Sequence, residues 1–238
     1  MLSGNNKDQG KERTHLILKL LAKHYPQAAT GLVYANPFQL LVAVVLSAQT
    51  TDEQVNRITA ELFTAIPSAA EMSAKEPADL EYYLRNGGLF RHKSRFLVEA
   101  SKRIVDVFGG QVPEHFEDLI TLPGVGRKSA NVIISSAFGQ PALAVDTHVF
   151  RVSRRLGLAD GATVIQVEEQ LKKIVPKHEW SASHHRLIAH GRALCHARRP
   201  KCSMCFLMEN CLYRSELSFG QKEGRGFDAV GKANLEGT

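Results

Sequence analysis

The sequence lacks any long apolar run. No stretch of its 238 residues approaches the roughly 20 consecutive apolar residues that span a bilayer. The N-terminal segment MLSGNNKDQGKER also lacks the apolar core of a secretory signal peptide. We therefore expect a cytoplasmic protein with no membrane partner.

Strands of alternating apolar and polar residues are missing too, as are internal repeats. Apolar residues recur instead at helical spacing, as Val55, Ile58 and Leu62 do. This pattern predicts an all-α fold with short connections. The expected helices include residues 12–24, 37–48, 77–86, 93–108, 113–121, 146–155, 166–175 and 184–195. Two polar ends are expected to be disordered, a leader at residues 1–11 and a tail at residues 215–238.

Cysteine is absent outside one short segment near the C-terminus. All four cysteines lie there in the pattern Cys-x6-Cys-x2-Cys-x5-Cys, as Cys195, Cys202, Cys205 and Cys211. Such clustering argues against a disulfide scaffold and predicts a metal site. Structural zinc usually takes two short ligand pairs, whereas one compact loop of four thiolates suits a cubane iron–sulfur cluster. The spacing alone favours zinc and an iron–sulfur cluster about equally.

The stretch from Leu122 to His148 carries the remaining chemistry. Its Leu-Pro-Gly-Val-Gly start predicts a glycine hairpin that leads into a helix, and a helix N-terminus binds anions. Lys128 falls in the first turn of this helix, where the dipole lowers the pKa of a lysine and favours a nucleophilic neutral amine. Asp146 is a plausible N-cap of the next helix. The alternative is that Lys128 only binds phosphate and Asp146 only caps.

Net charge is modestly positive. The formal value is +6 at pH 7. This balance suits a polyanionic partner without proving one.

The segments LPGVGRKSA and AVDTHVFRV resemble the helix-hairpin-helix and Gly/Pro-Asp signature of the DNA glycosylase superfamily. The lysine at the hairpin–helix junction resembles the endonuclease III branch. The resemblance implies a two-lobed helix-hairpin-helix DNA glycosylase fold with a C-terminal [4Fe-4S] loop. Residues 35–143 would form a helical bundle domain, with the helix-hairpin-helix at about 114–138. Residues 12–34 and 144–214 would form the iron–sulfur cluster domain.

The resemblance also implies an activity. The protein would be a bifunctional DNA glycosylase/AP lyase of base excision repair, monomeric and associated with the nucleoid through DNA. It would remove oxidised pyrimidines from duplex DNA and cleave the strand by β-elimination. Lys128 would attack the sugar C1′ and form a Schiff base, and Asp146 would assist. The cysteine spacing matches the family's [4Fe-4S] loop, which decides between iron–sulfur and zinc.

Contacts to DNA follow from the same resemblance. Gln49 resembles the family's inserted glutamine, and Leu89 resembles its apolar wedge. The alternatives are a polar residue at a helix end and a core leucine. His92 would line the lesion pocket. Further contacts are expected from the hairpin and the cysteine loop, at Gly124, Val125, Gly126, Arg127, Arg198, Arg199 and Lys201. The loop charges could instead be solvated or offset the charge of the cluster.

Three other functions remain as alternatives. A monofunctional adenine-mismatch relative would lack a lysine at position 128 and carry a further C-terminal domain. A non-catalytic helix-hairpin-helix module would only hold backbone phosphate. A zinc-stabilised DNA binder would use the same cysteines without iron.

Overall fold

The structure is a computed structural model that describes residues 3–215, with side chains described from residue 10 onward. These residues form helices and connecting turns without any strand, so the all-α prediction is confirmed. No helix in this described part is both long and apolar enough to cross a membrane. Residues 216–238 of the predicted tail lie outside the described residues.

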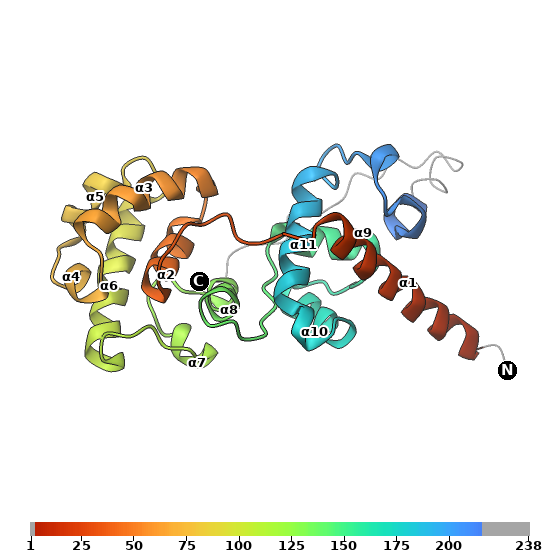
Figure 1. Cartoon of the computed structure of the whole chain (residues 1–238), viewed down its shortest axis with the longest axis horizontal. Helices are drawn as coiled ribbons and strands as arrows, with labels where there is room; N and C mark the ends of the chain where they lie inside the picture. The colour runs from red at the N-terminus through yellow and green to blue at the C-terminus, as the bar shows by residue number, and fades with distance from the viewer. Residues whose placement is uncertain (1–2, 216–238) are drawn as a thin grey trace. The chain divides into compact units, whose positions relative to one another are not determined.

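Two compact units make up the chain (Figure 1). Residues 30–144 form one unit, which we call the bundle unit. The residues before and after it form the other, which we call the cluster unit. These divisions lie close to the predicted boundaries at residues 35 and 143.

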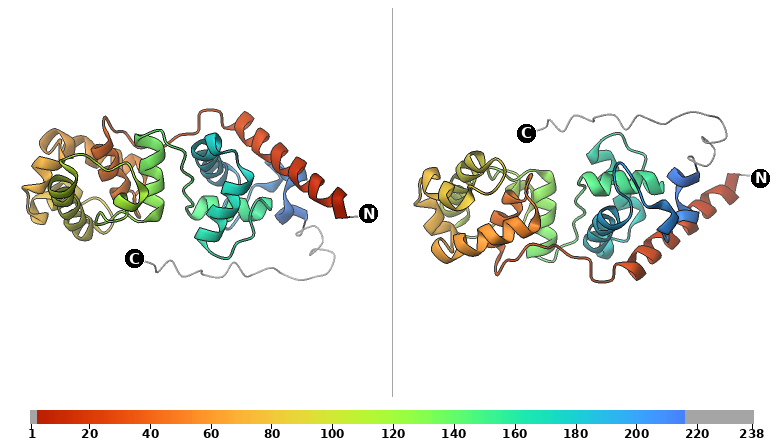
Figure 2. Two further views of the ribbon diagram at one scale, coloured as in Figure 1. Left: turned by 90° about the horizontal axis from the view of Figure 1, so that it is seen from below. Right: turned by 90° about the horizontal axis from the view of Figure 1, so that it is seen from above.

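The centre of the bundle unit is helix α2 (Pro37–Leu46). Asn36 caps it by accepting a hydrogen bond from the Gln39 N–H at 2.9 Å, and Pro37 occupies the first helical position, where a missing N–H costs nothing. This confirms the helix predicted at residues 37–48, and nearly every later residue of α2 is buried. Helix α8 (Arg127–Ala137) packs beside it, and both are visible in Figures 1 and 2.

The other helices of the bundle unit surround this pair. Helices α4 (Ala69–Ser73) and α5 (Pro77–Leu84) pack against the long α6 (Phe90–Phe108), while α3 (Asp52–Ala65) packs against α2. The sequence did not predict α4, because its five residues are too few to show a period. A capping box between Ser68 and Glu71 starts it.

The remaining helix, α7 (Phe116–Leu119), is shorter than the predicted range 113–121. The chain after α7 enters tight turns, with the Leu122 N–H donating to the Leu119 carbonyl at 3.1 Å. These turns begin the hairpin that leads to α8.

The cluster unit brings together both ends of the described chain. Helices α1 (Ser3–His24) and α9 (Thr147–Leu156) pack against α11 (Trp180–Ala193), and α10 (Val164–Ile174) packs against α9 (Figure 2). Short 3-10 turns lie before α11, at Lys177–Glu179, and after it, at Cys202–Met204 and Met208–Asn210.

The expected leader is wrong for residues 3–11, because α1 already begins at Ser3. Ile17 and Leu21 anchor the helix in the core, and the preceding Lys, Gln, Glu and Arg residues propagate a helix well. Polar composition was therefore compatible with a helix in this segment.

Candidate functional site

The hairpin between α7 and α8 is built around Gly124. Its φ of 79° is left-handed, and an added Cβ would lie 3.0 Å from the Cβ of Phe96, so only glycine fits. Val125 is buried, and its N–H donates to the Leu122 carbonyl at 3.0 Å. Gly126, with extended backbone, is the N-cap of α8. The Val125 amide already has an acceptor within the hairpin, and its phosphate contact stays a prediction.

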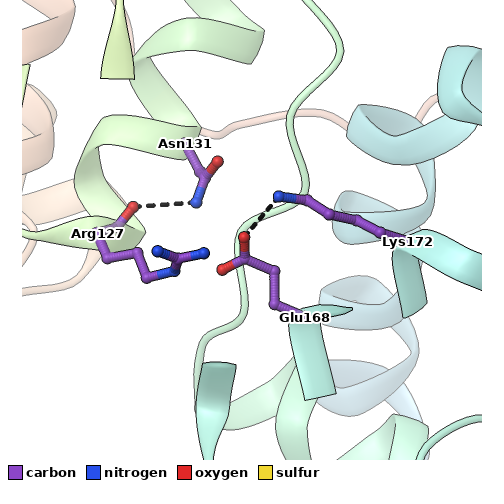
Figure 3. A network of polar contacts seen from close by, with 4 residues as sticks. All are labelled: Arg127, Asn131, Glu168 and Lys172. Atoms are coloured by element: carbon purple, nitrogen blue, oxygen red, sulfur yellow. Dashed lines mark hydrogen bonds and ion pairs between the residues drawn. The ribbon is translucent and has the colours of Figure 1, made fainter. Parts of the chain in front are cut away.

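The first turn of α8 exposes Arg127 and Lys128. The Arg127 guanidinium lies over the ring of Phe116, 5.2 Å from its centroid. The Arg127 carbonyl accepts a hydrogen bond from Nδ2 of the buried Asn131 at 3.2 Å (Figure 3). The turn that carries Lys128 is thus tied to both helices of the hairpin motif.

Gln49 and Leu89 share an unusual backbone. They are the non-glycine residues with positive φ in the described part of the chain, at 54° and 57°. Gln49 is exposed in the turn after α2, and Leu89 is 52% exposed just before α6. The alternative of a core leucine is therefore wrong. His92 is also exposed, in the first turn of α6.

In the cluster unit, Asp146 caps α9, as the sequence predicted. Its Oδ1 accepts a hydrogen bond from the Val149 N–H at 2.8 Å, and the residue is half-buried. Burial lowers the pKa of the nearby His148, whose Nδ1 lies 3.2 Å from Nη2 of Arg151. This hydrogen bond engages one of the two carboxylate oxygens of Asp146.

All four cysteines line one small cavity of about 20 Å³ that is partly open to solvent. Burial raises the pKa of the Cys205 and Cys211 thiols, and the charges of the neighbouring cysteines add to the shift. Four thiolates at this spot consequently need compensating positive charge, which the iron of a bound cluster would supply. Among the described residues, no three cysteine, histidine or carboxylate side chains are grouped to hold a single metal ion.

Arginines that the sequence interpretation missed hold this loop. Arg155 of α9 is buried and donates to the carbonyls of His196 at 2.7 Å and Ala197 at 2.8 Å. Its Nη1 also lies 3.5 Å from Sγ of Cys195. Arg13 of α1 donates to the Asn210 carbonyl at 2.9 Å. A signal was present, since Arg155 falls three positions after the inward Val152.

Three exposed cations lie on the loop between the first two cysteines. We call Arg198, Arg199 and Lys201 the loop cations. Their exposure is compatible with phosphate contact and equally with simple solvation.

Fold and site together define a class of protein. Residues 42–177 match the family model of the HhH-GPD superfamily of base excision DNA repair proteins. Residues 195–211 match the iron–sulfur binding domain of endonuclease III. The chain is 47% identical over 188 residues to endonuclease III of Bacillus subtilis (strain 168), covering 79% of this chain and 86% of that protein. It therefore belongs to the endonuclease III family and is a DNA glycosylase/AP lyase of base excision repair.

Two solved structures extend the comparison. One is a trapped endonuclease III–DNA covalent intermediate in an estranged-adenine complex, with a TM-score of 0.84, 44% identity, and coverage of 87% of this chain and 98% of that one. The other is a non-covalent endonuclease III–DNA complex with the same TM-score and identity, and coverage of 88% and 98%. DNA is the partner of this chain, and its four cysteines bind a [4Fe-4S] cluster. These findings decide against a non-catalytic module and against zinc.

Proposed function

We propose that the enzyme acts as a cytoplasmic, nucleoid-associated monomer that removes oxidised pyrimidines from duplex DNA and then cleaves the abasic strand. The observation that carries this proposal is the pair of exposed, left-handed residues Gln49 and Leu89. Both are exposed non-glycine residues held in a disfavoured conformation, which suits insertion of their side chains into a partner.

Base extrusion is the first step. A base inside a duplex cannot be reached, so the lesion nucleotide leaves the stack, which is easiest when the base pairs poorly. Leu89 fills part of the vacated space as an apolar wedge. The Gln49 amide, which both donates and accepts, hydrogen-bonds the orphaned partner base. His92 follows Leu89 at the start of α6 and lines the lesion pocket.

Phosphate binding is the task of the hairpin. The N–H groups of Gly124 and Gly126, with those of the first turn of α8, bind a backbone phosphate near the lesion. Arg127 adds a positive charge at the same turn. The loop cations contact further phosphates, and the cluster stiffens the loop that carries them.

The chemistry is the task of Lys128. Its neutral amine attacks C1′, and the bond from C1′ to the base breaks with its electron pair leaving on the base. Loss of a proton from the nitrogen and opening of the sugar ring give a Schiff base. The C2′ proton is then removed, and the bond from C3′ to the phosphate oxygen breaks. Asp146 stabilises the positive charge that develops on the sugar and accepts a proton.

Single-turnover kinetics test this function. Duplexes that differ only in one residue, an oxidised pyrimidine or its undamaged counterpart, are incubated with excess enzyme, and base release and strand cleavage are followed separately. We expect both events at the oxidised pyrimidine alone, and Lys128→Ala should abolish both. Lys102→Ala, which removes an exposed lysine of α6, is the matched control and should react normally. Cleavage by Lys128→Ala at the wild-type rate would refute the proposal.

A further inference from the structure

Lys93 is a buried lysine that the reaction described above does not use. It lies in the first turn of α6 and is 4% exposed. Its Nζ donates hydrogen bonds to the Leu46 carbonyl at 2.8 Å, the Ala48 carbonyl at 2.6 Å and Thr50 Oγ1 at 3.0 Å. The side chain thus reaches the end of α2 and the turn that follows it.

Burying this amine is unfavourable. Desolvation lowers the pKa of Lys93 to about 8 from its ordinary value of 10.5. The three hydrogen-bond acceptors are two backbone carbonyls and a hydroxyl, all of them neutral. A methionine of similar length would fill the same space without that cost. The hydrogen bonds, and not the packing, therefore account for a lysine at this position.

Those hydrogen bonds fix the turn that presents Gln49. The acceptors flank Gln49 on both sides, at residues 46, 48 and 50. The left-handed conformation of a non-glycine residue is disfavoured by about five- to thirty-fold in population. Gln49 keeps this conformation at a φ of 54° on an exposed turn. The residues beside Gln49 must consequently be held in place by contacts from outside the turn.

Lys93 also contacts the segment that presents Leu89. Its backbone N–H donates to the Leu89 carbonyl at 3.1 Å. The Gly88 N–H donates to Thr50 Oγ1 at 3.3 Å, the same oxygen that accepts from Lys93. An added Cβ at Gly88 would lie 2.9 Å from the Gln49 carbonyl oxygen, so the two segments are in close contact. One residue therefore joins both turns.

We propose that Lys93 is a positioning residue that fixes the Gln49 and Leu89 turns in their left-handed conformations before DNA binds. The inference rests on the proposed insertion of both side chains. Preorganisation of this kind raises affinity, because the turns are ordered before the complex forms. Its effect falls on lesion recognition and not on binding to undamaged duplex, where neither side chain is inserted.

Binding to a duplex with a non-cleavable abasic analogue tests the inference. Lys93→Met should weaken this binding about five- to thirty-fold, and binding to undamaged duplex by less than about twofold. Lys102→Met, on the same helix but exposed, should leave both affinities unchanged. Thr50→Val, which removes the shared hydroxyl at constant size, should act in the same direction as Lys93→Met. The thermal midpoint and the cluster absorbance near 400 nm report whether each variant is folded.

A double-mutant cycle separates positioning from a general structural role. In a Gln49→Ala/Leu89→Ala background, Lys93→Met should change the abasic-duplex affinity by less than about twofold. Should the loss be the same in both backgrounds, or should Lys93→Met and Thr50→Val leave lesion binding intact, the positioning role is wrong. Should the Gln49→Ala/Leu89→Ala enzyme itself bind the abasic duplex normally, the insertion step fails, and the positioning role fails with it.

Discussion

The observed cap and the proposed catalytic role of Asp146 can be separated by substitution. Its Oδ1 caps α9 through the Val149 N–H, and we propose that its charge assists the chemistry of Lys128. Asparagine caps a helix as well as aspartate does but carries no charge. Alanine provides neither the cap nor the charge. The pair Asp146→Asn and Asp146→Ala therefore distinguishes stability from catalysis.

The magnitudes follow from the geometry. Asp146→Ala removes a 2.8 Å cap at a half-buried position, a loss of about 1 kcal/mol within the range of about 0.5–2 kcal/mol for such caps. For a chain of this length, the thermal midpoint should fall by about 2–4 °C. Asp146→Asn should lower it far less. Both variants should react about 100- to 1000-fold more slowly, since each lacks the carboxylate that stabilises the developing charge.

Thermal unfolding and single-turnover rates on lesion duplex provide the two measurements. Thr163→Ala is the matched control, because Thr163 caps α10 through the Gln166 N–H at 3.2 Å and has no proposed part in the chemistry. It should lose stability to a similar extent and keep the full rate. An Asp146→Asn enzyme that reacts at the wild-type rate would show that the residue only caps.

Three further predictions concern the cluster loop, DNA binding and pH. Arg155→Leu removes the donors to two loop carbonyls at a cost of about 2–3 kcal/mol. The cluster absorbance near 400 nm should therefore decay faster in the presence of a chelator. The control Arg154→Leu, on the exposed face of α9, should behave like the wild type. Replacing all loop cations by alanine should reduce the salt dependence of DNA affinity by about 0.9 per lost phosphate contact, and an unchanged slope would mean that they are only solvated. Because the folded pKa of Lys93 is about 8 and its ordinary value is 10.5, the unfolded chain binds more protons between these values. As pH rises through this window, the free energy of unfolding of the wild type should increase relative to that of Lys93→Met, by at most about 1.4 kcal/mol per pH unit. Denaturant titrations measure this difference. A difference that does not change with pH would contradict the argument that Lys93 is buried.

Most of the fold could be predicted from local patterns in the sequence. Helical spacing of apolar residues shows directly which face is buried, and the α2 segment was recognisable from its proline start and continuous apolar character. The four cysteines lie within seventeen residues, so their common cavity was predictable from spacing alone. Such features depend only on neighbours along the chain.

Features that depend on distant partners were not predictable in this way. The hydrogen bonds of Lys93 could not be predicted, because their acceptors belong to the end of α2 and to the turn after it. The spacing of Arg155 from Val152 indicated an inward side chain, but its hydrogen-bond acceptors lie in the cysteine loop and could not be predicted. The left-handed backbone of Gln49 and Leu89 had no signal, because neither residue type favours it.

The central claim is that the amine of Lys128 attacks the DNA sugar. Borohydride reduction during turnover on a lesion duplex, followed by peptide mapping of the adduct, tests it most directly. The account predicts one covalent protein–DNA adduct, attached at Lys128 and absent from Lys128→Ala. An adduct at another residue, or none from an active wild-type enzyme, would contradict it.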